Sequence, residues 1–542
     1  MSDPIRGNEN SGFTRGDLLK RAAAGGLVIA SGSVLAACGS SGSTAGGTAT
    51  GGSTASAGKP VMGGNLRVGM VGNGTAETLN PSIGVVPIDA ARAFNLFEGL
   101  VYCDTKNKIQ PMLAEEWEPN KDATVWNIKL RKGVTFHNGK PFGADDVIFS
   151  LRAMGSPSNF GHSSVTNIKL KDLKKVNEHE VEVPLYTPNG RLLDLFAYFN
   201  QLMVQDGETN FDNPVGTGPF QFKSFTAGRQ SIFTRYADYW DSHKPYVDQL
   251  EIISIDEDSA RLNALKAGEI DLMSQLSFPD AKAELAAGSP SIQVFQGKSP
   301  TFYTFYMDQS KPPFDDVRVR QAMMAAIDRE KLIEVALDGF GNPGKDIGGR
   351  GLELFAESLP EKKQDIEKAK SLLKEAGLSS VDVTLSTSPI FAGFVESATQ
   401  LQQQVKEAGF NVTLKEVQPS QYLVPPPGGL WLTMQFGQDK WPTPSLQSYY
   451  TQALVKGAPY NESHEENAAA GKLVKAAIEA VSQEDQEKRW LEVQEYQYNE
   501  GGNLIWAQPE NVDAGAKNIA GLDPGGIFEL GNFQFKNVWF SS

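Results

Sequence analysis

The stretch that decides the fold runs from residue 94 to residue 151 and reads FNLFEGLVYCDTKNKIQPMLAEEWEPNKDATVWNIKLRKGVTFHNGKPFGADDVIFSL. From Val125 to Leu130 every second side chain is apolar, which predicts a half-buried strand. Asn138-Gly139 indicates a tight turn. Asp145, followed by the apolar residues Val147, Ile148 and Leu151, predicts a capped helix. The segment therefore alternates strands, turns and a helix within one compact block.

This succession resembles the signature block of the family 5 extracytoplasmic solute-binding proteins, which are peptide- and nickel-binding subunits of ABC importers. Its four sub-motifs appear in order as Glu98-Gly99-Leu100-Val101, 111–117 (PMLAEEW), 130–139 (LRKGVTFHNG) and Ala144-Asp145-Asp146-Val147. Further segments resemble the family at 213–222 (NPVGTGPFQF), 235–240 (RYADYW) and 316–322 (DVRVRQA). The resemblance implies a bilobal α/β protein of the class II periplasmic-binding-protein type. An extra subdomain would lie in the first lobe, and the ligand cleft would lie between the lobes.

The expected division of the chain follows from composition and from the resemblance. Residues 1–38 are expected to be a lipoprotein signal peptide, and residues 39–62 are a Gly-, Ser- and Thr-rich tether. The first lobe is expected at 63–298, with the extra subdomain at about 100–210. The second lobe is expected at 299–505, and residues 506–542 would return to the first lobe.

The first 38 residues are expected to carry an export signal rather than part of the fold. A basic start precedes an apolar run from Ala22 to Leu35, which is shorter than the roughly 20 residues that a membrane span needs. The run ends in Leu35-Ala36-Ala37-Cys38, which resembles a bacterial lipobox and implies lipid attachment to Cys38. The segment 14–20 (TRGDLLK) resembles a twin-arginine motif with Gly16 in place of the second arginine, so Sec and twin-arginine export stay open. The expected location is the outer face of the cell membrane or the periplasm.

Composition excludes several function classes. The formal net charge of −15 argues against a nucleic-acid partner, which would require clustered Lys and Arg. The chain has 2 cysteines, Cys38 and Cys103, so a disulfide framework is excluded, and we expect Cys103 to be a buried small side chain. The 5 histidines are scattered without a metal-binding spacing, and His137 is expected to be structural. We expect no cofactor, no metal and no catalytic residue.

The second half of the chain alternates helices and strands. The pattern predicts helices at 365–376 and 396–408, and strands at 381–385 and 410–414. Such a series is typical of a mostly parallel sheet covered by helices. In the first half, residues 174–184 alternate as a single further strand.

A phosphate-binding loop is imitated by residues 339–345, GFGNPGK. The loop motif requires Ser or Thr after the lysine, and this chain has Asp346. The segment also follows a helix rather than a strand. We interpret it as a loop that ends a helix and not as a nucleotide site.

The segment 433–442, TMQFGQDKWP, is the most informative for a ligand. The resemblance implies a strand that ends near Asp439, whose carboxylate would pair with the terminal ammonium of a peptide. The alternative is that Asp439 is a turn or cap carboxylate. Phe436, Trp441 and Trp506 could form apolar platforms for sugar rings or apolar side chains, with core packing as the alternative. The resemblance also implies backbone contact with ligand at Gly84, Val85 and Val86.

These observations predict a solute-binding receptor that captures short peptides outside the membrane and delivers them intact to an ABC permease and its ATPase subunits. Oligosaccharides are the second candidate for the ligand, and a nickel chelate is the third. The contrasting class is an extracellular hydrolase or chaperone, which would require a nucleophile and base or metal ligands that the sequence does not cluster. The receptor is expected to be a monomer anchored by lipid.

Overall fold

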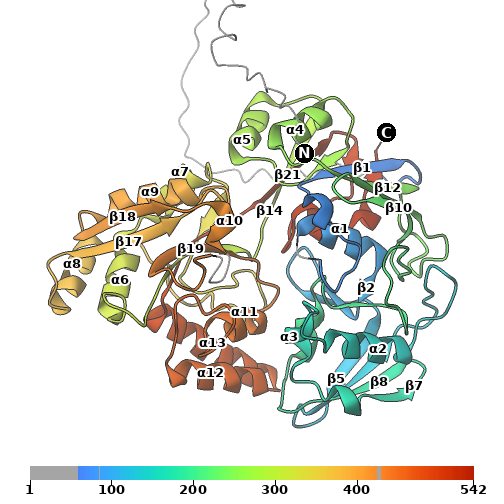
Figure 1. Cartoon of the computed structure of the whole chain (residues 1–542), viewed down its shortest axis with the longest axis horizontal. Coiled ribbons are helices and arrows are strands. Elements are labelled where there is room, and N and C mark those ends of the chain that lie inside the picture. The colour runs from blue at the N-terminus through green and yellow to red at the C-terminus, as the bar shows by residue number, and fades with distance from the viewer. Residues whose placement is uncertain (1–58, 85, 424–428, 542) are drawn as a thin grey trace, which may run out of the picture. The chain divides into compact units, whose positions relative to one another are not determined.

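Two separate β-sheets organise the chain. The computed structural model describes residues 59–84, 86–423 and 429–541, so the expected sites at Cys38 and Val85 lie outside the described residues. We call the part built on the seven-stranded sheet the first lobe, and the part built on the four-stranded sheet that contains β15 the second lobe. The fold class is therefore the expected one, a mixed α/β protein with two lobes (Figure 1).

The first-lobe sheet is mixed, in the order β10-β11-β12-β1-β13-β21-β14. β1 (Asn65–Met70) is the predicted opening strand, and it pairs in parallel with β12 (Gln249–Ser254) and β13 (Leu272–Met273). The remaining strands pair antiparallel: β10 (Phe220–Thr226), β11 (Gln230–Arg235), β14 (Ile292–Gly297) and β21 (Asn511–Ala516). Helices α1 (Pro87–Leu96), α4 (Asp258–Lys266) and α5 (Phe278–Ala287) belong to this lobe.

The extra part of the first lobe has its own antiparallel sheet, β5 (Ala114–Pro119), β6 (Val125–Leu130), β8 (Glu180–Pro184) and β7 (Lys174–Asn177). β6 has the predicted bounds. The single strand expected at 174–184 is instead the hairpin β7–β8, because Asn177 accepts a hydrogen bond from the His179 amide in the turn (2.9 Å). Helix α2 (Ala144–Met154) begins at the expected place, but Asp146 rather than Asp145 closes its start by accepting from the Gly143 amide (2.8 Å).

Several short elements complete the first lobe and join its parts. They are β2 (Glu98–Gly99), β3 (Val101–Cys103), β4 (Ile109–Pro111), β9 (Leu202–Met203), β22 (Ile519–Ala520), β23 (Trp539–Phe540), α3 (His162–Val165), α14 (Glu529–Asn532) and 3-10 turns at 74–76, 170–172, 192–196 and 535–537. Cys103 is buried, as expected, and burial raises the pKa of its thiol to about 12. His137 is half-buried: its Nε2 lies 3.0 Å from the Gly218 carbonyl oxygen and burial lowers its pKa to about 4, in agreement with a structural role.

The family-like residue Glu98 has a structural partner from the far end of the chain. Tyr239 donates a hydrogen bond to the Glu98 carboxylate (2.7 Å), and the buried Lys536 ammonium donates to the same Tyr239 oxygen (3.1 Å). Trp240 adds its indole N–H to Glu98 (3.0 Å). The signature block is therefore tied to the C-terminal segment by a charge-compensated buried cluster.

The second-lobe sheet is antiparallel, in the order β16-β20-β15-β19, so the prediction of a mostly parallel sheet is wrong. The chain enters this lobe along β15 (Phe302–Met307) and leaves it along β20 (Asn503–Pro509), and neighbouring strands that run in and out must be antiparallel. β16 (Gly341–Pro343) and β19 (Phe436–Trp441) pair with them. Only the pair β17 (Val381–Thr387) and β18 (Phe410–Glu416), separated in sequence by α9 (Phe394–Val405), is parallel in this lobe's described part.

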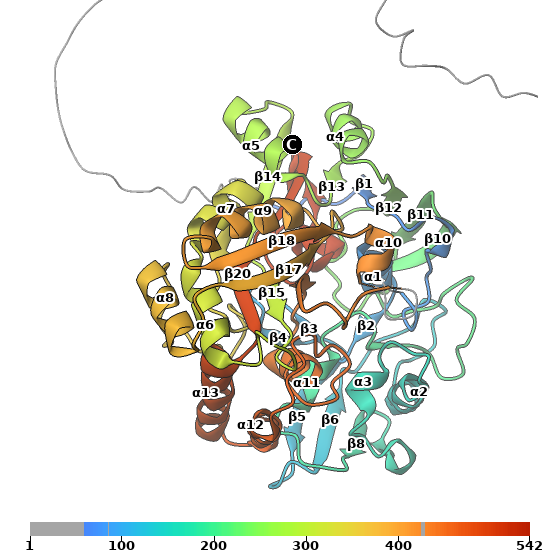
Figure 2. The same ribbon diagram turned by 60° about the vertical axis from the view of Figure 1, so that its left-hand side comes forward.

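Two sets of helices cover the second-lobe strands (Figures 1 and 2). The set α6 (Val317–Ala326), α7 (Arg329–Ala336), α8 (Ile366–Glu375) and α9 (Phe394–Val405) shares a hydrophobic core with Phe305 and Phe436. The set α11 (Leu446–Ala453), α12 (Ala468–Glu479) and α13 (Gln483–Glu500) shares another with Phe302 and Trp441. The short helix α10 (Pro419–Tyr422) follows β18. Among the described residues, no helix is both long and apolar enough to cross a membrane.

The lobes are connected through two strand-to-strand crossings. The first lies at residues 298–301, between β14 and β15, and the second is Glu510, between β20 and β21. The sequence placed the second crossing at 506, but Trp506 lies inside β20 and belongs to the second-lobe sheet. Both crossings are short, which suits a hinge between two rigid parts.

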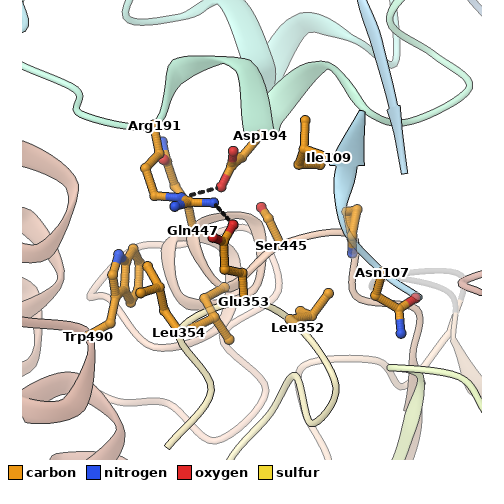
Figure 3. A pocket seen from close by; sticks show the side chains of 12 residues that line it. Asn107, Ile109, Arg191, Asp194, Leu352, Glu353, Leu354, Ser445, Gln447 and Trp490 are labelled. Carbon is orange, nitrogen blue, oxygen red and sulfur yellow. Dashed lines mark hydrogen bonds and ion pairs between the residues drawn. The ribbon is translucent and has the colours of Figure 1, made fainter. Parts of the chain in front are cut away.

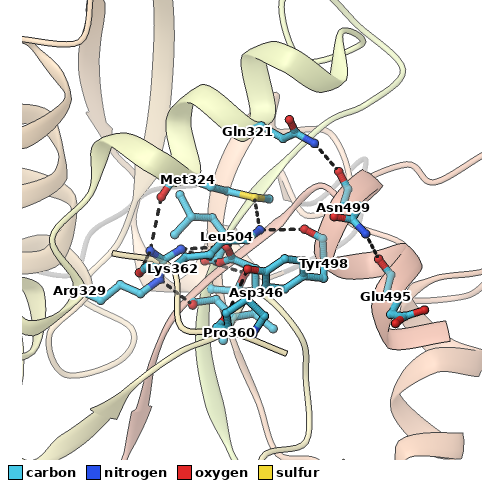
Figure 4. Close-up of polar contacts among 12 residues, drawn as sticks. Gln321, Met324, Arg329, Asp346, Pro360, Lys362, Glu495, Tyr498, Asn499 and Leu504 are labelled. Atoms are coloured by element: carbon cyan, nitrogen blue, oxygen red, sulfur yellow. Dashed lines mark hydrogen bonds and ion pairs between the residues drawn. The ribbon is translucent and has the colours of Figure 1, made fainter. Parts of the chain in front are cut away.

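The segment that imitates a phosphate-binding loop has a structural use (Figure 4). Gly341–Pro343 is the edge strand β16, and Asp346 is fully buried against Arg329, whose Nη2 donates to both carboxylate oxygens (2.8 and 2.9 Å). Lys362 contributes a second cation at 3.1 Å from the Asp346 carboxylate. Lys345, the lysine of the motif, donates to the Glu357 carbonyl (3.0 Å).

Candidate functional site

Asp439 lies in β19, opposite Thr304 of β15. Side chains alternate between the two faces of a strand, so Gly437, Asp439 and Trp441 share one face. Phe436, Gln438 and Lys440 point to the other face, where Phe436 joins the helix-covered core. The strand continues two residues beyond the position at which the sequence expected it to end.

A second carboxyl group, Glu462, lies beside Asp439. It comes from the loop between α11 and α12 and is 2% exposed, while Asp439 is 8% exposed. The two carboxyls share a hydrogen bond, which requires a proton on one of them. Burial raises the pKa of Asp439 to about 6. Burial also raises the pKa of Glu462 well above its ordinary value, and the nearby charge of Asp439 raises it further.

Three aromatic side chains surround this carboxyl pair. Trp431 donates its indole N–H to one oxygen of Glu462 (2.6 Å), and Trp441 donates to the other (3.2 Å). Tyr460 lies against both indoles, with ring centroids 5.1 Å from Trp431 and 5.9 Å from Trp441. Because Tyr460 is 40% exposed, the group opens to solvent on this side.

The first lobe contributes a facing aromatic group. The Tyr198 ring lies 4.8 Å from Phe199 and 5.3 Å from Phe528, and Phe94 packs edge-on against Phe199 and Phe528. The phenol of Tyr198 is close enough to Tyr460 of the second lobe to interact with it electrostatically, and burial raises its pKa. One aromatic group therefore lies on each lobe, with Tyr198 in the first and Tyr460 in the second.

A buried acidic group lies next to these first-lobe rings. Glu529 adjoins Phe528 in sequence and is 8% exposed; one of its oxygens accepts from Gln275 Nε2 (2.7 Å), and the other has no hydrogen-bond partner among the described residues. Burial, together with the Glu529 charge, raises the pKa of Asp513 to about 7. The first lobe thus also presents acidic, hydrogen-bond-accepting groups near the junction.

A small cavity between the lobes lies beside a polar contact (Figure 3). Arg191 donates to Asp194 of its own lobe and to Glu353 of the second lobe, each at 2.6 Å. The Gly190 amide donates to the Ile478 carbonyl across the same boundary (2.8 Å). With a volume of about 20 Å³, the cavity has room for one or two waters and not for a ligand side chain, so it is a contact between the lobes rather than a ligand site.

The remaining site residues expected from the sequence fall into two groups. Phe436 and Trp506 are fully buried in the second-lobe core, where both pack against Phe305, so both take the alternative role of core packing. Gly84 is close to the first-lobe rings: its carbonyl accepts from Asn200 Nδ2 (3.2 Å), and a Cβ there would lie 3.7 Å from Phe199. Val86 is partly buried against the first-lobe core.

Sequence reasoning missed most of the side chains that the structure gathers here. They are Tyr198, Phe199, Trp431, Tyr460, Glu462, Phe528 and Glu529. The sequence did contain evidence against Phe436 as a ligand contact beside Asp439. Residues 436 and 439 differ by an odd number, so their side chains cannot lie on the same face of one strand. Among the described residues, no group of three or more His, Cys, Asp or Glu could hold a metal ion.

A fold with two lobes joined by two strand crossings is typical of the bilobal solute-binding proteins. Solved structures agree on the fold. The ABC transporter substrate-binding protein CtaP from Listeria monocytogenes is 21% identical, with a TM-score of 0.77 over 89% of this chain and 100% of that one. The peptide complex of the periplasmic binding protein DppA from Helicobacter pylori is 22% identical, with a TM-score of 0.71 over 89% and 99%.

Sequence comparison identifies the family. Residues 108–458 match the bacterial extracellular solute-binding proteins, family 5 Middle, and the chain belongs to that family. The oligopeptide-binding protein AppA of Bacillus subtilis is 26% identical over 503 residues, which cover 84% of this chain and 90% of the relative. The heme-binding protein A of Haemophilus influenzae is 30% identical over 299 residues, covering 50% and 54%. As a member of an extracellular family of solute-binding proteins, the chain acts outside the cytoplasm.

Proposed function

We propose that this protein is the receptor of an ABC importer and that it captures short peptides by their free amino terminus. The observation that carries the proposal is the buried carboxyl of Asp439, which lies beside Glu462 and has no Lys or Arg side chain as partner among the described residues. A buried acid without a cation suits a ligand that brings its own positive charge. Relatives named for oligopeptide and dipeptide binding support this ligand class.

The geometry supplies both charge recognition and apolar contact. The peptide ammonium would donate to Asp439, while apolar side chains of the peptide would pack on Tyr198 and Phe528 of the first lobe. Closure about the two crossings would bury the ligand and strengthen the charged contact by excluding water. No bond of the ligand is made or broken in this mechanism.

The remaining partners follow from the proposed role. A lipid on Cys38 would hold the protein at the membrane, and residues 39–62 would let the folded part reach the permease. The receptor would act as a monomer and would pass the unaltered peptide to the permease and its ATPase subunits.

Calorimetric titration of the purified protein with Ala-Ala-Ala and with its N-acetylated form tests the role of the ammonium. We expect the free-amine peptide to bind and the acetylated peptide to bind at least tenfold more weakly. Asp439→Asn should weaken the free-amine peptide by about 10- to 100-fold, because a charge-assisted hydrogen bond contributes roughly 1.5–3 kcal/mol.

Asp382→Asn is the matched control, since Asp382 is an exposed aspartate on β17 of the same lobe. Equal affinity for the two peptides, or an unchanged affinity in Asp439→Asn, would contradict the proposed capture of the amino terminus. Binding of an oligosaccharide and of no peptide would overturn the ligand class, and recovery of a cleaved peptide would overturn the receptor role.

A further inference from the structure

Glu462 is the feature of the site that the proposed function does not yet use. The loop that carries it is fixed: the Glu462 amide donates to the Tyr460 carbonyl (2.9 Å), and the Asn461 side chain accepts from the Glu465 amide (2.8 Å). Both carboxylate oxygens of Glu462 accept an indole N–H, from Trp431 and Trp441. The carboxyl is therefore held in one orientation, against Asp439.

The charges around the pair do not neutralise it. The titratable groups that face it are the phenols of Tyr306 on β15, Tyr422 on α10 and Tyr449 on α11, and burial raises the pKa of each, so they are uncharged at neutral pH. His464, two residues beyond Glu462, lies 3.3 Å from Asp308 instead. The Lys440 ammonium lies 5.5 Å from the Phe391 ring, and only its backbone N–H donates to Asp439 (2.7 Å).

A second observation indicates that the site awaits a polar group. The hydroxyl of Tyr306 is fully buried and has no hydrogen-bond partner among the described residues. The end of its ring lies over Gly437, on the face of β19 that carries Asp439, and the hydroxyl is close enough to both carboxyls to interact with them. A buried hydroxyl without a partner is costly unless a bound group completes its hydrogen bonding.

Two carboxyls can accept two positive charges. Without ligand they share one proton, because two buried anions side by side repel each other. A single ammonium neutralises the remaining charge and leaves the proton in place. A second cation nearby would displace that proton to the solvent. Trp431 and Tyr460, which are both partly exposed, offer ring faces on which such a cation can lie.

Building on the proposed function, we propose that Glu462 is a specificity-determining residue that selects peptides whose first residue is Lys or Arg. Such a ligand brings an α-ammonium and a side-chain cation, and its binding releases the proton that Asp439 and Glu462 share. A peptide with an uncharged first residue binds the same site through its α-ammonium alone and keeps the proton bound.

The test compares Lys-Ala-Ala with norleucine-Ala-Ala, which keeps the methylene chain and lacks the second charge. Titration calorimetry at pH 7, where the pair holds close to one proton, is run in two buffers of different ionisation enthalpy. It gives both the affinity and the number of protons released. We expect Lys-Ala-Ala to bind at least tenfold more tightly and to release close to one proton, while the norleucine peptide releases few or none.

Two variants test whether Glu462 causes the preference for Lys-Ala-Ala and the proton release. Glu462→Gln should lose both the preference and the proton release while still binding the norleucine peptide. Glu466→Gln, an exposed glutamate of the same loop that pairs with Lys456, should behave like the wild type.

Equal affinity of the wild type for the two peptides, without proton release, overturns the inference and leaves the peptide receptor standing. Failure of both peptides to bind overturns the receptor for peptides and the inference with it. Because the two peptides are compared on the wild-type protein, the result holds even if Glu462→Gln does not fold.

Discussion

Two aspartates of the second lobe, Asp346 and Asp439, are both buried but have opposite surroundings. Asp346 is fully buried and is paired with Arg329 and Lys362 (Figure 4). Asp439 is 8% exposed, and its charged neighbour is another acid, Glu462. Asp346 is compensated by cations of the chain, as Glu98 is by Lys536, whereas the pair of Asp439 and Glu462 has no such cation among the described residues. The difference indicates which carboxylates await a ligand, since burying a charge without a partner destabilises the free protein.

Replacing Asp by Asn should change the free energy of unfolding in opposite directions at the two positions. The larger change is expected at Asp346. Asp346→Asn leaves Arg329 and Lys362 buried without their anion, so we expect the free energy of unfolding to fall by about 3–5 kcal/mol. Urea unfolding followed by circular dichroism measures this change. Asp382→Asn, an exposed aspartate of the same lobe, should change it by less than about 0.5 kcal/mol. A loss of similar size in both variants would mean that the buried cluster contributes no more than a surface charge.

Asp439→Asn should instead stabilise the ligand-free protein. Burial raises the pKa of Asp439 from 3.8 to about 6, so the folded state holds a proton that the unfolded chain has already lost. The resulting stability is fully present below pH 3.8 and is lost as the pH rises through about 6. If the whole pKa difference acts on stability, the ionised Asp439 carboxylate lowers the free energy of unfolding at neutral pH by about 3 kcal/mol.

We therefore expect Asp439→Asn to raise the free energy of unfolding at pH 7 by about 1–3 kcal/mol and to have little effect at pH 4. Unfolding in urea at a series of pH values, compared with the wild type at each pH, provides the measurement. A variant that is less stable than the wild type at pH 7 would show that Asp439 is a scaffold carboxylate, as Asp346 is.

Sequence patterns located the strands and helices but not all of their pairings. Alternation placed β6 correctly, and the apolar spacing of α8 placed that helix within one residue at each end. The direction of β20 relative to β15 was not visible, because it depends on how the chain passes between lobes rather than on local pattern. Each strand looked the same whether its neighbour ran parallel or antiparallel.

The site was only partly predictable for a related reason. Asp439 lies in a segment that resembles family members, so its position could be transferred residue by residue. Glu462 comes from a different loop beyond α11, and no short-range spacing links the two carboxyls. Tyr198 and Phe528 come from the first lobe and are even further away in sequence. Contacts that form only on tertiary folding leave no periodic trace in the chain.

The smallest effect is expected where the lobes touch away from the acidic pair. The ion pair of Arg191 and Glu353 crosses the boundary at 2.6 Å, but the Glu353 side chain is 60% exposed, so solvent weakens it. Glu353→Gln should accelerate peptide dissociation about two- to fivefold, since an exposed ion pair contributes up to about 1 kcal/mol. Stopped-flow tryptophan fluorescence with excess unlabelled competitor measures the rate.

Glu357→Gln is the matched control, because Glu357 forms an ion pair with Lys345 and both residues belong to the second lobe. It should leave the dissociation rate unchanged. If Glu353→Gln also left the rate unchanged, the Arg191 contact would not resist opening, and closure would depend on the ligand and the two crossings. If both variants accelerated dissociation equally, the effect would come from the net charge of the lobe. Only a change confined to Glu353→Gln assigns it to the contact between the lobes.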